Sequence, residues 1–305
     1  MLDLRRLRLL RELHRRGTIT AVAEALSFSP SAVSQQLATL EREVGVRLLE
    51  PAGRRVRLTA QGEALVEHAA VLLEQVERAE ADLARSVEEI SGTLRVASFQ
   101  TAVMALLPAT LTWLAQQHPM LRVEVTELEP ETALPAMIAG EYDLVIAEEY
   151  PGQPLPRLRE ADRTDLLTDE LVLAVPVGWG VRQLTDLADR PFVAEPAGTS
   201  AGQWALATCR AAGFEPDVRY TSTDLGIHLR LVREGLAAAL LPELAGPREV
   251  TDVGVRRLEH RPTRTIFAAV RRGATERPAA RAFSEAVTEA KTPGDRSGER
   301  WGSAR

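Results

Sequence analysis

The sequence predicts an α/β protein in three parts: a small helical domain, one long helix, and a body of two α/β lobes. Three observations predict this arrangement. Short amphipathic helix patterns fill the first 58 residues, and a proline-free stretch with an apolar stripe continues to residue 90. Strand-like and helix-like runs then alternate as far as residue 290, a pattern typical of α/β folds. A length of 305 residues suits about two domains.

Charge is distributed unevenly along the chain. The first 57 residues hold eleven arginines against six acids, a net charge of +5, whereas residues 58–90 hold two arginines against eight acids. The whole chain nevertheless carries a formal net charge of −6. A basic end on an acidic body indicates that one end meets a polyanion while the rest avoids it.

Several classes of site and location are excluded at this point. A single cysteine, Cys209, excludes an internal disulfide framework and a cysteine-rich zinc site. The five histidines have no metal-ligand spacing and no phosphate-binding glycine pattern occurs, so we expect neither a metal nor a cofactor. Arginine interrupts the first apolar runs, and no run approaches the ~20 apolar residues of a membrane span. We therefore expect a cytoplasmic protein that does not associate with membranes.

The first two helices are predicted by apolar spacing and capping residues. Leucine recurs every three residues from Leu4 to Leu13, which predicts an amphipathic helix that ends near Gly17. Thr20 is a suitable N-cap for a second short helix over Ala21–Leu26, whose alanines allow close helix packing.

A third helix is predicted over Pro30–Val44, with Ser29 as its N-cap and proline at its first position. The apolar face of this helix, which we expect to be buried, consists of Val33, Leu37, Leu40 and Val44. Two short helices joined by a tight turn, the second with small polar residues at its N-terminus, are typical of a helix-turn-helix. The expected DNA-contacting residues of this segment are Ser29, Pro30, Ser31, Ser34, Gln35 and Gln36. Glutamine can bind adenine with two hydrogen bonds, and serine can bind either kind of base edge.

A basic β-hairpin, or wing, is predicted after the third helix. Residues 50–59 read as a turn between two short strands, and this places Arg54 and Arg55 beside DNA phosphates or in a minor groove. The alternative is a small helical domain with an ordinary solvent-exposed arginine face.

The stretch from Thr59 to Ile90 predicts one long helix of roughly 48 Å, at 1.5 Å per residue. Its near-heptad apolar stripe consists of Leu65, Ala69, Leu72, Val76, Ala79, Leu83, Val87 and Ile90. Such a stripe needs a partner helix, so we expect dimerisation through this helix. An intramolecular hairpin with another helix of the same chain is the alternative. Two identical DNA-binding ends would suit a two-fold symmetric site in double-stranded DNA.

The body divides into two sets of alternating elements, which predicts βα units around a mostly parallel sheet. Strands are expected at residues 93–97, 121–125, 144–147, 171–175, 192–194, 218–221, 237–241 and 265–270. Helices are expected at residues 102–117, 132–139, 184–188, 200–212, 225–234 and 277–290. Residues 291–305 have no periodic apolar pattern and predict a disordered tail.

The segment from Thr18 to Leu49 and the segment from Arg54 to Gly62 resemble the helix-turn-helix, wing and linker helix of LysR-type transcriptional regulators. The resemblance is strong over about residues 1–92 and looser over 93–290. It implies a winged helix-turn-helix, a two-lobed effector domain like the periplasmic binding proteins, a small-molecule effector, and a tetramer built from two dimers. Many members carry arginine where this chain has Gln35, so the preferred bases cannot be transferred from a relative.

The expected domains follow from these elements. They are a DNA-binding domain at 1–58, a linker helix at 59–91 and an effector domain at 92–290, with lobe I at 92–165 and 266–290 and lobe II at 166–265. Ligands of open α/β sheets bind at the carboxyl ends of strands, near helix N-termini. The expected effector-binding residues at such positions are Ser98, Gln100, Thr101, Glu148, Thr199, Ser200 and Thr223. The alternative is that these hydroxyls only cap helices. They are compatible with a carboxylate, an amino acid or an aromatic acid as effector.

Two other functions remain as alternatives to an effector-controlled regulator. One is a DNA-binding oligomer without any effector. The other is a serine hydrolase, because Gly198–Gly202 matches the G-x-S-x-G nucleophile motif, and Asp224 and His260 follow it. No glycine-rich oxyanion loop precedes the motif, so we expect the protein not to be an enzyme.

Overall fold

The computed structural model describes residues 1–26, 28–53, 55–87 and 89–290, with only the backbone at positions 55 and 290. The expected tail at 291–305 and Arg54 of the wing lie outside the described residues.

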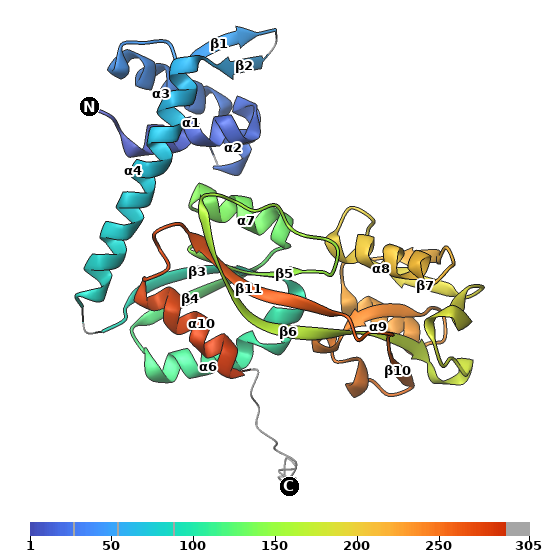
Figure 1. Ribbon diagram of the computed structural model, residues 1–305. Coiled ribbons are helices and arrows are strands. Elements are labelled where there is room, and N and C mark those ends of the chain that lie inside the picture. The colour runs from blue at the N-terminus through green and yellow to red at the C-terminus, as the bar shows by residue number, and fades with distance from the viewer. Residues whose placement is uncertain (27, 54, 88, 291–305) are drawn as a thin grey trace.

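The N-terminal domain consists of three helices and a hairpin (Figure 1), namely α1 (Leu4–Arg16), α2 (Ile19–Ala25), α3 (Pro30–Val44), β1 (Leu49–Ala52) and β2 (Arg55–Leu58). The expected bounds of the third helix and its cap at Ser29 are confirmed. The expected cap of the second helix at Thr20 is wrong. Gly17 ends α1 with a φ of 74°, and Thr18 follows directly as the cap of α2, accepting a hydrogen bond from the Ala21 N–H. Thr20 is therefore already helical.

A single apolar core joins these elements. Leu7 and Leu10 of α1 pack with Val22 of α2 and with Val33 and Leu37 of α3. Because this core occupies one side of α3, the polar side of its N-terminal half faces outward.

The long helix α4 (Ala60–Arg85) ends five residues earlier than expected, because the chain turns at Ser86, whose hydroxyl donates to the Leu83 carbonyl at 2.7 Å. Two sides of α4 differ in burial. Val66 and Leu73 are buried within the chain, whereas Leu72 and Leu83 of the predicted stripe are 40% and 70% exposed. The predicted stripe is thus largely uncovered in one chain, although Ala69 is buried.

The first lobe contains β3 (Gly92–Ser98), α5 (Gln100–Ala105), α6 (Leu107–Gln117), β4 (Leu121–Glu127), α7 (Pro130–Ala139), β5 (Leu144–Glu149) and α10 (Pro278–Ala290). One helix was expected over residues 102–117, but two form, because Leu106 caps the end of α5 and Pro108 lies in the first turn of α6. Helices α6 and α10 pack together on one face of the sheet, and α7 lies on the side nearer the N-terminal domain (Figure 1).

Two long strands connect the lobes, β6 (Ala161–Pro176) and β11 (Thr263–Arg271). The large sheet has the order β10-β6-β11-β5-β3-β4, and β9 also pairs with β6. The first part of β6, up to Glu170, pairs with β11, and the rest pairs with β9 and β10. The expectation of a mostly parallel sheet is wrong, because both connecting strands run antiparallel to their neighbours.

The second lobe contains β7 (Pro191–Ala194), α8 (Ser200–Ala211), β8 (Asp217–Thr221), α9 (Leu225–Arg233), β9 (Ala239–Pro242) and β10 (Val253–Arg257). Strand β10 was not expected from the sequence, and the expected helix at 184–188 is a short 3₁₀ turn over Leu184–Leu187. Across the described part of the chain, no helix combines the length and apolarity needed to cross a membrane.

Candidate functional site

The N-terminal end of α3 exposes six polar or small residues on one surface. All six expected DNA-contacting residues from Ser29 to Gln36 are exposed. The Ser29 hydroxyl accepts from the Ala32 N–H at 3.1 Å and lies 3.0 Å from the Ser31 hydroxyl. Within the described residues, the side chains of Ser34 and Gln35 make no intramolecular hydrogen bond, so both are available to a ligand.

Other residues of this surface are already engaged. The Gln36 amide oxygen accepts from the Arg6 Nε at 3.0 Å, which turns this side chain toward α1. On the wing, Arg57 pairs with Glu50 of the opposite strand at 2.6 Å. Arg55 lies at the start of β2, but its side chain is not described. Phe28 is 55% exposed beside this surface and was not singled out from the sequence.

The second candidate site is built around Arg264, which is 1% exposed where β11 enters the first lobe. Its Nη2 donates to the Thr101 hydroxyl at 2.7 Å and lies 2.8 Å from the Asp169 carboxylate. Its Nη1 binds Glu148 and lies 3.3 Å from the Tyr150 hydroxyl. Burial alone would lower the pKa of Arg264, but the negative charge of Glu148 leads the contributions that raise it. Arg264 is therefore a cation whose donors are fully used inside the protein.

A small cavity lies beside this cluster, between the two lobes. Its volume is about 10 Å³, room for about one water molecule. Its lining consists of Glu129, Pro130, Glu131, Glu148, Glu195, Thr199, Ser200 and Ala201. Four carboxylates from two lobes thus surround a water-sized space.

Burial shifts the pKa values of three of these carboxylates. Burial raises the pKa of Glu148 to about 7, against the opposing charge of Arg264. Burial, together with the charges of Glu148 and Glu129, raises the pKa of Glu195 to about 8. Burial and the neighbouring Glu131 also raise the pKa of Glu129. The positive charge of Arg264 therefore only partly compensates the negative charge of the carboxylates in the cavity.

Two pairs of hydrogen bonds join the lobes, one of them at this cavity. The Ser200 hydroxyl donates to Glu131 at 2.8 Å, and the Ser200 N–H at the start of α8 lies 3.4 Å from the same oxygen. Gln100 donates to Asp224 at 3.0 Å and accepts from the Leu225 N–H at 2.9 Å. The chain thus places its own carboxylate, Glu131, at the helix N-terminus where an anionic ligand would bind.

The structure brings some of the expected effector residues together and separates others. Glu148, Thr199 and Ser200 line the cavity, and Thr101 contacts Arg264. Thr199 mainly caps α8, as its hydroxyl accepts from the Gly202 N–H at 3.0 Å. Ser98 is buried and Thr223 is exposed, and neither lines this cavity.

Sequence reasoning missed Arg264, Asp169, Glu129, Glu131 and Glu195. An arginine beside the apolar run 265–270 is the one signal that could have indicated a buried ion pair. Its partners lie 95 to 163 residues away along the chain, so no local pattern identifies them.

The serine of the G-x-S-x-G motif is used differently from a hydrolase nucleophile. Ser200 donates to Glu131, and the His260 side chain is 90% exposed and lies 3.7 Å from Glu259. In the described residues no hydrogen bond joins Ser200 to His260 or Asp224. No group of three or more His, Cys, Asp or Glu in this part of the chain could hold a metal ion.

Family models match nearly the whole chain. Residues 4–63 match the bacterial regulatory helix-turn-helix protein, lysR family, and residues 88–292 match the LysR substrate binding domain. The chain belongs to the LysR family of transcriptional regulators. It is a DNA-binding regulator with an effector-binding domain, and not an enzyme.

Relatives of this LysR-type regulator match most of its length. A probable hydrogen peroxide-inducible genes activator of Mycobacterium avium is 31% identical over 76% of this chain and 75% of the relative. The DNA-binding transcriptional dual regulator OxyR of Escherichia coli is 28% identical over 87% of this chain and 88% of the relative.

Solved structures share the complete fold of the regulator. A full-length OxyR variant from Pseudomonas aeruginosa has a TM-score of 0.65 at 20% identity, covering 94% of this chain and 95% of that one. Full-length CbnR in complex with its target DNA has a TM-score of 0.54 at 25% identity, covering 95% of this chain and 99% of that one.

The raised pKa values in the cavity predict that acidification stabilises the effector domain. The folded chain holds protons on Glu148 and Glu195 at pH values where an unfolded chain has lost them. Their contribution to stability is therefore complete below the usual glutamate pKa of 4.5 and is lost as the pH rises through about 7 to 8. Thermal unfolding of the wild type and Glu195→Gln across this range measures the effect.

We expect Glu195→Gln to flatten the dependence of the unfolding temperature on pH. Glu259→Gln, at an exposed carboxylate, should retain the slope of the wild type. Equal slopes for all three proteins would contradict the assignment of the titration to the cavity.

Proposed function

We propose that this regulator binds an inverted-repeat DNA site as a dimer, and that a small cationic effector between its lobes controls this binding. We retain the proposed domains at 1–58, 59–91 and 92–290. The observation that carries the effector assignment is the cavity lined by Glu129, Glu131, Glu148 and Glu195. An effector controls binding only if it prefers one arrangement of the lobes over another.

The DNA contacts are divided between base reading and phosphate binding. Ser31, Ser34 and Gln35 are exposed at the end of a helix that suits the major groove, so we assign them to base edges. Ser29 and Pro30 begin the helix and set its position, and Gln36 supports it through Arg6. We assign Arg54 and Arg55 of the wing to phosphates or a minor groove.

The uncovered side of α4 supports dimerisation. Leu72 and Leu83 lie on the same side of the helix and are 40% and 70% exposed, although an apolar stripe of this kind is normally buried. The neighbouring side, about 100–120° around the helix with Val66 and Leu73, packs within the chain, and the side with Leu72 and Leu83 remains free. A partner α4 would cover it. We further propose a tetramer of two dimers, located in the cytoplasm.

The charged groups around the cavity favour one chemical class of effector. Arg264 is saturated by Glu148, Asp169 and Thr101, and Glu131 already occupies the N-terminus of α8. A carboxylate effector would add negative charge to a site whose donors are in use. The –NH₃⁺ head of an alkylamine, by contrast, is about the size of the water molecule that the cavity has room for, and it has three N–H donors for carboxylates. We therefore favour an amine over the carboxylate or aromatic acid that the sequence left open.

Peroxide chemistry is disfavoured as the signal, although the Mycobacterium avium relative is named for hydrogen peroxide. Cys209 is the single cysteine of the chain and is buried. Burial, with a smaller contribution from Glu215, raises the pKa of its thiol to about 12. Since the thiolate is the reactive form, this cysteine is unsuited to sensing an oxidant.

Base reading is tested by Gln35→Ala. We expect this substitution to weaken the preference for one base, by ~1–3 kcal/mol if the Gln35 amide makes two hydrogen bonds to that base. Gln36→Ala is the matched control and should not change base preference, since its amide is bound by Arg6. Binding to a set of single-base variants of a selected site, at several salt concentrations, gives the measurement.

Substitution of both wing arginines, Arg54→Ala with Arg55→Ala, should weaken binding to every sequence and reduce its salt dependence in the same assay. If Gln35→Ala and the wing variant behaved alike, the division between base reading and phosphate binding would be wrong.

Dimerisation through α4 predicts that Leu72→Glu with Leu83→Glu yields monomers with weakened DNA binding, because the charges cannot be buried in an apolar seam. Ala64→Glu adds one charge at an exposed position away from this stripe and should leave the oligomer intact. Sedimentation and light scattering give the masses. A wild type that is already monomeric, or a double variant that stays dimeric, would refute the α4 interface.

The effector class is tested by thermal unfolding with butylamine and diaminobutane, against butyrate and succinate of matched length. We expect the amines to raise the unfolding temperature by mass action, and to do so less in Glu195→Gln. The amines should also change the affinity for DNA. Stabilisation by the carboxylates alone would contradict a cationic effector, and no stabilisation by any of the four would favour the effector-independent oligomer.

A further inference from the structure

Helix α7 contacts both functional parts of the molecule. It has ten residues, Pro130–Ala139, and is about 15 Å long at 1.5 Å per residue. Its first turn supplies Pro130 and Glu131 to the cavity between the lobes. Its last turns contact α1 of the helix-turn-helix domain, which lies on the same side of the sheet (Figure 1).

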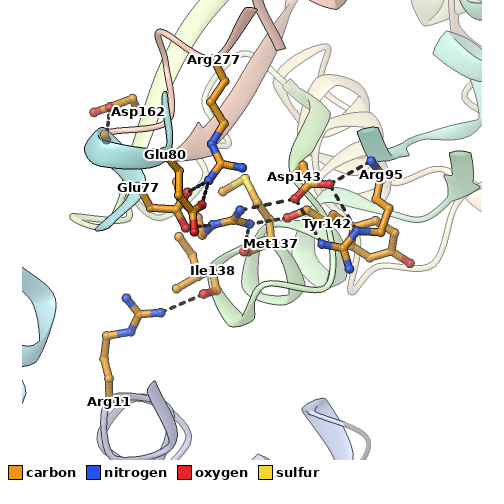
Figure 2. A network of polar contacts seen from close by, with 12 residues as sticks. Arg11, Glu77, Glu80, Arg95, Met137, Ile138, Tyr142, Asp143, Asp162 and Arg277 are labelled. Atoms are coloured by element: carbon orange, nitrogen blue, oxygen red, sulfur yellow. Dashed lines mark hydrogen bonds and ion pairs between the residues drawn. The ribbon is translucent and has the colours of Figure 1, made fainter. Parts of the chain in front are cut away.

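Arginines of α1 bind carbonyl groups of α7. Arg11 donates to the Ile138 carbonyl at 2.8 Å (Figure 2), and Arg15 donates to the Pro135 carbonyl at 3.0 Å. A Cβ atom at Gly140, directly after the helix, would lie 2.8 Å from the Arg8 guanidinium. Because the C-terminus of a helix carries partial negative charge, three cations around it are favourable.

These arginines are sensitive to the position of α7. Arg11 is 7% exposed, and burial lowers the pKa of both Arg11 and Arg15. Their compensating charge comes from Glu12, which is fully buried and lies 3.4 Å from Arg15. The Nε of Arg11 and one Nη of Arg15 already have no hydrogen-bond partner. Losing the α7 carbonyls as well would leave further buried donors unpaired, which is costly.

The linker helix is attached to the same end of α7. Arg271 donates to the carbonyls of Met137 and Tyr142, at 3.2 and 2.6 Å, and to Glu77 of α4 at 2.5 Å. Glu77 also accepts a hydrogen bond from the Arg277 guanidinium at 2.8 Å (Figure 2). The C-terminal end of α7 therefore contacts α1 directly and contacts α4 through one buried guanidinium.

The other end of α7 contacts the second lobe at the cavity. Ser200 of α8 binds Glu131, so this contact exists when the lobes are together and is lost when they separate. Pro135 lies between the two ends and has no N–H to donate to the Glu131 carbonyl, which weakens the helix between them.

We propose that α7 transmits the state of the cavity to the DNA-binding end, by a small shift along its axis that makes or breaks the contacts of Arg11 and Arg15. This inference rests on the proposed function, since it supplies the route for effector control. Shifts of 1–2 Å between packed helices are a common form of such coupling. Coupling is reciprocal, so changes at the cavity must alter DNA affinity, and DNA must alter the cavity.

A double-mutant cycle between the two ends of α7 tests the proposal without an effector. DNA affinity is measured on a duplex selected from random sequence by the wild type. We expect Ser200→Ala to change the dissociation constant about 5-fold in the wild type and less than about 2-fold in Arg11→Ala/Arg15→Ala. Ser284→Ala on α10, the same substitution away from α7, should have no effect in either background.

Each result decides the proposal. An equal effect of Ser200→Ala in both backgrounds, or no effect in the wild type, would overturn it. If the double arginine variant unfolds, Arg15→Ala alone completes the cycle, because this side chain is 21% exposed and tolerates truncation better. Failure of amines to bind leaves the cycle unaffected, whereas a wild type without any DNA preference would remove the proposed function itself.

Discussion

Arg264 holds together the strands on which both lobes are built. It lies on β11 and binds Glu148 of β5, Asp169 of β6 and Thr101 of α5. Breaking a buried ion pair by removing one partner typically costs 3–5 kcal/mol, so this arrangement strongly constrains the place where the lobes meet. The same guanidinium is the cation that balances a cavity lined by Glu148 and three further glutamates. Stability of the fold and the charge of the cavity therefore depend on one residue.

The charge of this cavity affects both lobes. Burial raises the pKa values of Glu129, Glu148 and Glu195, so closing the lobes around them favours their protonation or their neutralisation by a positive group. The α7 helix starts at these carboxylates and ends at the arginines of α1, so one short element spans the distance between an ionic cavity and the DNA-binding domain. Buried ion pairs at both ends favour discrete arrangements over gradual deformation.

Local signals predicted the DNA-binding end well. Ser29 followed by Pro30, and glycine after each of two helices, determine helix ends through neighbouring backbone groups, so the bounds of α1 and α3 were predictable. The extent of β6 and the existence of β10 were not, because both depend on pairing between distant segments. In the cavity, Glu148 and Ser200 were found from their positions after a strand and before a helix. Arg264 and Glu131 were missed because their partners are far away in the sequence.

In the mechanism that we propose, the cavity between the lobes and the DNA-binding end form one coupled system. A direct measurement places spin labels on the two lobes, at Thr126→Cys and Asp189→Cys, which are exposed positions in a protein whose single native cysteine is buried. The distribution of distances between the labels is recorded with and without a selected DNA duplex. We expect DNA to shift this distribution of distances, and an identical distribution in both samples would contradict coupling between the cavity and the DNA-binding end.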